Sequence, residues 1–214
     1  RARAEDMTHL LDRFDAIEAA VPWLAGRVDR TRVAVAGHSL GGHTAGLLLG
    51  ARNTDPGTGE AVDLLEPRIT AGVLLAAPGR GGDDVLTGPM AEAISFVHSS
   101  DFATMTTAAL VVAGDKDDSR HFTDAGPEWH TDPYTLAPGP KTLLTLFGAE
   151  HGLGGIAGYD AAETTDENPA LVAALGRLVP AYLRTRFDPA DDAWRTTSDA
   201  LTTGPDAVGR VESK

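Results

Sequence analysis

The sequence predicts an α/β protein in which a mainly parallel β-sheet is flanked by helices. Three apolar runs, at residues 33–36, 108–113 and 141–147, have the composition and length of buried parallel strands. Helical patterns alternate with these runs, as they do in βαβ units. Each run ends in a turn of glycine and polar residues. Because the carboxyl ends of parallel strands share one sheet edge, we expect these turns to meet there.

The remaining elements follow in chain order. We expect a helix over 7–24, a strand over 32–36, a helix over 40–51, a surface loop over 53–59 and a strand over 73–77. The strands over 108–113 and 141–147 come next, then a helix over 168–186 with a leucine stripe and a further helix near 190–201. With 214 residues, 42% of them apolar, the chain can bury one sizeable core. We therefore predict one domain over 1–188, with a short lid-like insertion at 78–107, and a tail over 189–214 that packs on the surface.

A glycine-rich turn follows the first apolar run. Residues 37–42 read GHSLGG, and a helix with small residues comes directly after them. This pattern predicts a serine nucleophile, Ser39, on a sharp strand-to-helix turn. Such a serine adopts positive φ, so its neighbours must lack a Cβ, and Gly37 and Gly41 meet that need. The alternative is an inert structural turn.

A serine hydroxyl is a weak nucleophile near pH 7, so the turn needs a base and an orienting acid. Three carboxylates, Asp115, Asp117 and Asp118, follow the 108–113 strand, and His151 follows the 141–147 strand. We take Asp117 as the acid, with Asp115 and Asp118 as competing candidates. A calcium loop is disfavoured because the acidic turn lacks the glycine and the closing glutamate that such a loop uses.

Together the GHSLGG, GDKD and AEHG motifs resemble the α/β-hydrolase superfamily, in particular its esterase branch of chlorophyllases, dienelactone hydrolases and platelet-activating-factor acetylhydrolases. The resemblance runs from about Asp29 to about Arg186. It implies an α/β-hydrolase fold in which Ser39 is the nucleophile, His151 the base and Asp117 the acid, in the expected order. The backbone N–H of Leu40 would be one oxyanion donor.

The resemblance also implies strands and an oxyanion loop ahead of the nucleophile strand, where this chain has only about one helix. We therefore take the chain as the C-terminal portion of the sheet. We expect a missing N-terminal segment or a separate chain to complete the sheet and to supply the second oxyanion donor.

Substrate-binding candidates surround the predicted triad. His38 and His43 flank the nucleophile turn, and Phe102, Trp129 and Leu153 could form an apolar acyl pocket. Ordinary core packing is the alternative for each. The histidines show no spacing typical of a metal site, so we expect neither a metal nor a cofactor.

Composition narrows the function further. The net charge of −13 argues against binding to nucleic acid or to anionic membranes, which need clustered Lys and Arg. The chain has no cysteine and no apolar stretch long enough to span a bilayer, and we expect a soluble protein, cytoplasmic rather than secreted. The sequence thus predicts a serine hydrolase that cleaves a small to medium hydrophobic ester or lactone through an acyl-enzyme. The alternatives are a lactonase or thioesterase with the same triad, and a non-catalytic binding or subunit module.

Overall fold

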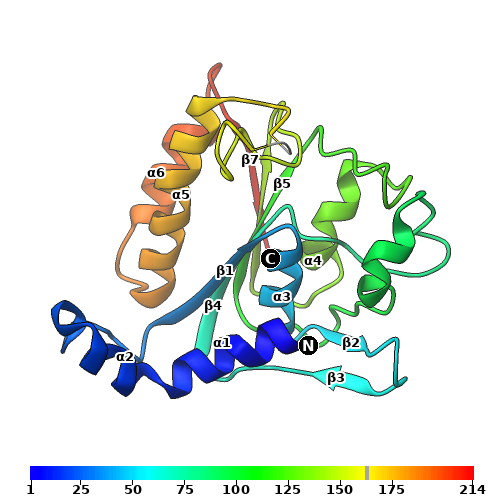
Figure 1. Ribbon diagram of the computed structural model, residues 1–214. Helices are drawn as coiled ribbons and strands as arrows, with labels where there is room; N and C mark the ends of the chain where they lie inside the picture. Colours follow the sequence, from blue (N-terminus) through cyan, green and yellow to red (C-terminus); the bar gives the residue numbers. More distant parts are fainter. Residues whose placement is uncertain (162–163) are drawn as a thin grey trace.

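A five-stranded sheet forms the centre of the computed structural model, which describes residues 1–161 and 164–214 (Figure 1). In spatial order its strands are β1 (Val33–His38), β4 (Ile69–Leu75), β5 (Ala109–Gly114), β6 (Lys141–Leu146) and β7 (Gly209–Ser213). The first four are parallel, and β7 runs antiparallel to β6. The predicted α/β class with a mainly parallel sheet is therefore confirmed.

Both faces of this sheet are covered, which explains the unbroken apolar runs. Every residue of β5 and β6 is buried. Side chains alternate along each strand, so Leu74 and Val111 join the core on one face, while Leu110 and Leu144 join the core on the other. A strand buried on both faces cannot show the apolar–polar alternation of a half-exposed one.

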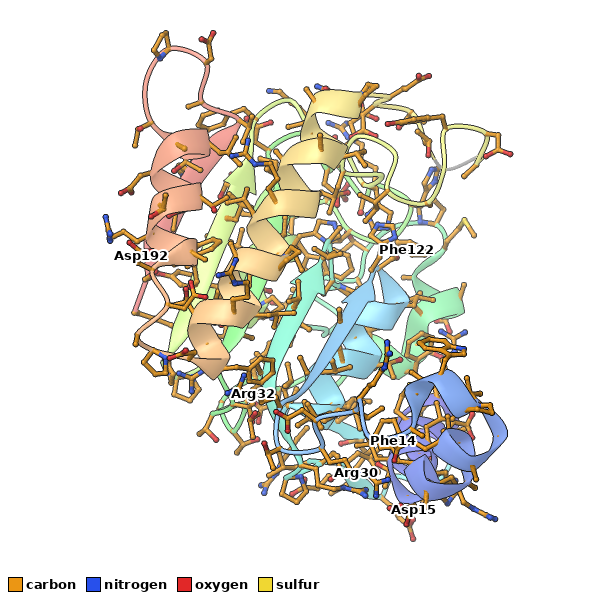
Figure 2. All side chains as sticks on the ribbon, turned by 90° about the vertical axis from the view of Figure 1, so that its left-hand side faces the viewer. Phe14, Asp15, Arg30, Arg32, Phe122 and Asp192 are labelled. Atoms are coloured by element: carbon orange, nitrogen blue, oxygen red, sulfur yellow. The ribbon has the colours of Figure 1, made fainter. Side chains whose placement is uncertain are left out.

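Helices form the outer layers. One face is covered by α1 (Ala2–Asp12), α3 (Leu40–Leu48) and the short α4 (Asp132–Thr135), and the other by α5 (Pro169–Phe187) and α6 (Ala193–Thr202). Figure 2 looks onto the second layer, with α5 and α6 side by side in front of the strands. α5 begins where the Asn168 side chain accepts hydrogen bonds from the backbone of Ala170 and Leu171. Among the described residues, no helix is both long and apolar enough to cross a bilayer.

The predicted helix over 7–24 is divided in the structure. α1 ends at Asp12, and α2 (Phe14–Ala20) and the 3₁₀ turn η1 (Pro22–Leu24) follow. Arg13 has φ −106° and ψ 10°, which interrupts the helical path between α1 and α2. Within α2 no residue is buried, so packing supplies little to hold one long helix together. Ion pairs from Arg30 to Asp15 and Glu18 hold this segment at the surface (Figure 2).

Two further expectations are corrected. The predicted loop over 53–59 belongs to a small hairpin of β2 (Arg52–Thr54) and β3 (Ala61–Asp63). The helix expected near 190–201 is present as α6, but the end of the predicted surface tail over 189–214 forms the edge strand β7 and so belongs to the sheet. The alternation of polar and apolar residues in β7 is what a strand exposed on one side requires. The insertion at 78–107 is short and contains the 3₁₀ segment η2 (Ala91–Val97).

Candidate active site

Ser39 occupies a strained turn between β1 and α3. Its φ of 54° and ψ of −122° lie outside the usual regions for a residue with a side chain. The turn is possible because a Cβ on Gly37 would lie 2.1 Å from the carbonyl oxygen of Gly41, and one on Gly42 would lie 2.7 Å from the Cβ of Ala77. At Gly41 itself an added Cβ would meet no described atom within 4 Å beyond its neighbours and its own helix. The glycines that the turn requires are therefore Gly37 and Gly42, not Gly41 as predicted.

Ser39, His151 and Asp117 are brought together from three separate loops. The Ser39 Oγ lies 2.9 Å from Nε2 of His151, and Nδ1 of His151 lies 2.9 Å from Oδ2 of Asp117. Because a carboxylate oxygen only accepts, Nδ1 carries a hydrogen and leaves Nε2 free to accept from the serine hydroxyl. The Asp117 side chain is 1% exposed and that of His151 is 34% exposed. A buried carboxylate thus orients a histidine whose other ring nitrogen faces the Ser39 hydroxyl.

The two competing carboxylates have other roles. Asp115 Oδ1 accepts a hydrogen bond of 2.7 Å from the backbone N–H of Gly148, which ties the β5 turn to the β6 turn. Asp118 is exposed and pairs with Arg120. Of the three carboxylates that the sequence offered, Asp117 is therefore the one that contacts His151.

Burial and hydrogen bonding act in opposite directions on Asp117. Burial alone would raise the pKa of its carboxyl group. Hydrogen bonds from His130 and His151 outweigh that effect and hold the pKa of Asp117 well below its usual range. The acid is therefore ionised across the neutral and mildly acidic pH range, which is the state that an orienting carboxylate needs.

His38 and Leu40 lie on either side of the nucleophile. The Nε2–H of His38, at the end of β1, donates to the backbone carbonyl of His151 over 2.8 Å and so anchors the base. Leu40 is the first residue of α3, so its backbone N–H has no acceptor within the helix. That N–H, together with the positive end of the helix dipole, can stabilise negative charge beside Ser39.

A cavity of about 610 Å³ opens beside the first turns of α3. Leu40 and His43 line it, with Phe96 from η2 and Asn53 from the hairpin. Burial lowers the pKa of His43 to about 4, so this ring is neutral at pH 7. The neutral ring can accept from the Asn53 amide nitrogen, 3.4 Å from its Nε2. Two of the predicted pocket residues, Leu40 and His43, thus share one cavity.

Phe102, Trp129 and Leu153 do not form the expected acyl pocket. Phe102 belongs to the core between the sheet and α3, and Leu153 to the core beneath α5. Trp129 lies in a third, smaller cluster under the 78–107 insertion, against which Leu40 packs. Apolar character alone did not distinguish these core positions from a pocket wall. Of the three, Trp129 is the one in a cluster against which Leu40 of the nucleophile turn packs.

One residue of the site was missed. His130, in the 3₁₀ segment η3 (Pro127–Thr131), is 1% exposed, contacts the same oxygen of Asp117 as His151 does, and has its ring 5.5 Å from that of His151. Its separation from Asp117 in the chain matches no spacing motif, so the sequence carries no signal for the contact. Atoms of Asp117, His130 and His151 lie within 4.8 Å of one another, a grouping that a metal ion could bridge and that a search for histidine spacings could not find.

Comparison with known proteins does not identify a family for this chain. No protein-family model matches this chain, and no curated protein matches it in sequence. The fold class is therefore taken from the sheet and its flanking helices. The function has to be argued from the geometry around Ser39.

Proposed function

We propose that this protein is a serine hydrolase of the α/β-hydrolase fold that cleaves carboxylic esters. The observation that supports it most is the pair of 2.9 Å contacts that join Ser39 to His151 and His151 to Asp117. The positive φ of Ser39 adds to it, because a strained backbone at a serine on a strand-to-helix turn is typical of an activated nucleophile. The order of strands and the position of the three loops at one sheet edge agree with this fold.

The reaction would proceed in two steps. In the first, Nε2 of His151 takes the Ser39 proton as Oγ attacks the ester carbonyl, and the backbone N–H of Leu40 donates to the oxyanion. His151 then gives that proton to the leaving alkoxide, and an acyl-serine forms. In the second step His151 removes a proton from water as the water oxygen attacks the acyl-serine, and then gives that proton to the Ser39 Oγ as the bond to the acyl group breaks and the acid is released. Asp117 keeps Nδ1 protonated and stabilises the imidazolium in both steps.

The surroundings favour a small to medium hydrophobic acyl or alcohol group. Leu40 packs against an apolar cluster that contains Val85, Leu86 and Trp129, and Met90 in the same insertion is 50% exposed. A lactone or a thioester fits the same chemistry, because the attacked carbonyl and the oxyanion are alike. We propose carboxylic esters as the main substrate class, with the protein acting in the cytoplasm.

We further propose that another strand pairs with the open side of β1. Among the described strands β1 pairs only with β4, and most of its residues are just partly buried, whereas those of β5 and β6 are buried throughout. An open strand edge invites pairing. A preceding segment of the polypeptide or a separate chain would fill this edge and bring the second oxyanion donor. Expression with and without such a segment, followed by measurement of kcat, tests this: an unchanged kcat would contradict it.

Hydrolysis of a short p-nitrophenyl ester tests the proposed function. Ser39→Ala should lower kcat about 10⁴-fold or more, because the nucleophile and its base act as a unit. Ser95→Ala, a serine in η2 outside the triad, is the matched control and should keep the wild-type rate. Turnover by Ser39→Ala equal to that of the wild type would exclude the mechanism.

A further inference from the structure

A second histidine, His130, contacts Asp117, and its ring lies beside that of His151 with the ring centroids 5.5 Å apart. The Nε2 of His130 lies 3.2 Å from Oδ2 of Asp117, the same oxygen that contacts His151. It also lies 2.9 Å from the Ser119 hydroxyl, which is itself 3.2 Å from Oδ1 of Asp117. The side chains of His130 and Asp117 are each 1% exposed. These groups form a closed polar network shielded from water.

The acceptors around His130 indicate where its hydrogens lie. Its Nδ1 is 2.9 Å from the backbone carbonyl oxygen of Ala77, which can only accept, so Nδ1 carries a hydrogen. Nε2 therefore faces Asp117, where it lies between Oδ2 of the carboxylate and the Ser119 hydroxyl. The Ser119 hydroxyl in turn lies 3.2 Å from the other carboxylate oxygen, Oδ1. In a buried site each of these polar groups needs a partner, and the network supplies one to each.

The residues that contact His130 hold its ring in place, and one of them also touches the nucleophile turn. Trp129 beside it packs edge-on against its ring and donates from Nε1 to the carbonyl of Arg80 over 2.8 Å. Ala77, the acceptor for His130, lies against Gly42 in the first turn of α3, where an added Cβ would come within 2.7 Å of the Ala77 Cβ. The loop after β4 therefore contacts both His130, which touches Asp117, and the turn that holds Ser39.

We propose that His130 is a positioning residue of the reaction: its Nε2 contacts Asp117 directly and through the Ser119 hydroxyl, and it holds that carboxylate so that Oδ2 faces Nδ1 of His151. This inference rests on the proposed serine hydrolase function and deepens it. The position of an acid relative to its histidine controls the rate strongly, since a displacement of about 1 Å in such a site can cost about 10²-fold. His130 does not reach the substrate carbonyl in this arrangement, so it acts on kcat through Asp117.

Three variants and a control test the proposal by steady-state ester hydrolysis. His130→Phe keeps a ring but removes both ring nitrogens, and His130→Asn is too short to bridge Ala77 and Asp117. We expect each to lower kcat by about 10²-fold with KM within about twofold of the wild type. His130→Gln retains an amide donor that can reach Asp117 and should recover part of the loss. His121→Gln, an exposed histidine on the loop before η3, should keep wild-type kcat.

A spectroscopic measurement covers the case in which the ring variants do not fold. NMR of ¹⁵N-labelled histidine should show the Nε2 resonance of His130 shifting between the wild-type protein and Asp117→Asn, while that of His121 stays unchanged. An Nε2 resonance of His130 that is the same in both proteins would overturn the proposal, as would wild-type kcat in a folded His130→Phe or His130→Asn variant. Failure of the proposed function is a separate result: the wild-type protein itself would then show no turnover that depends on Ser39.

Discussion

Gly37, two residues before the predicted nucleophile, provides the sharpest test of the local geometry of the turn. An alanine Cβ at Gly37 would lie 2.1 Å from the carbonyl oxygen of Gly41 and 2.7 Å from the backbone nitrogen of Gly42. These atoms belong to the first turn of α3, so no side-chain rotation relieves the overlap. The end of β1 and the start of α3 would have to separate, and Ser39 lies between them.

The expected cost follows from the size of this overlap. Real Cβ atoms essentially never approach another heavy atom closer than 3.0 Å, so the backbone around Ser39 would have to move by about 1 Å. Overpacking of this kind costs about 1–3 kcal/mol of unfolding free energy. A nucleophile displaced by about 1 Å from its base loses about 10²-fold in rate. We therefore expect Gly37→Ala to lower both stability and kcat.

Gly41→Ala is the matched control, two residues beyond the nucleophile. Its added Cβ would meet no described atom within 4 Å beyond its neighbours and its own helix, and alanine favours helix over glycine by about 0.5–1 kcal/mol. Urea unfolding and p-nitrophenyl ester hydrolysis of both variants give the comparison. Equal losses in the two variants, or a Gly37→Ala protein with wild-type kcat and stability, would refute this account of the turn.

Two further predictions concern the acid and the cavity. In ester hydrolysis, Asp117→Asn should lower kcat by about 10⁴-fold because an amide favours the wrong His151 tautomer, whereas Asp118→Asn should leave kcat near that of the wild type. A larger loss in Asp118→Asn than in Asp117→Asn would contradict the assignment of Asp117. Burial lowers the pKa of His43 from 6.5 to about 4, so between these pH values the unfolded chain takes up a proton that the folded one does not. The unfolding free energy should therefore fall as pH decreases from 6.5 to 4, and His43→Gln should lack that part of the decrease in urea unfolding at several pH values. An equal pH slope in the variant would contradict it.

Sequence reasoning was most successful where residues are buried on both sides. A short, unbroken apolar run such as 108–113 is typical of a central strand buried on both faces, so β5 was predicted within one residue at each end. The order of Ser39, Asp117 and His151 follows from the same strands, because each residue sits in a loop at a strand's carboxyl end. What the sequence could not decide was which carboxylate in the Asp115–Asp118 turn faces His151, since that depends on side-chain direction in the loop.

The misses share a physical cause, which is that long-range pairing leaves little local pattern. β7 pairs with β6 across more than sixty residues of sequence and is polar on its exposed side, so it resembled a tail. Phe102 and Leu153 are as apolar as a pocket wall, yet they pack in separate cores on opposite faces of the sheet. His130 is recognised only once folding has brought η3 against the loop that carries Asp117.

Covalent labelling of the nucleophile tests the central claim most directly. The wild-type chain treated with a fluorophosphonate probe, then digested and analysed by mass spectrometry, should carry the modification on Ser39. Labelling should be lost in Ser39→Ala and strongly slowed in His151→Ala, because the probe needs an activated hydroxyl. An unmodified Ser39 in the folded wild-type protein would contradict the account and favour a non-catalytic binding module.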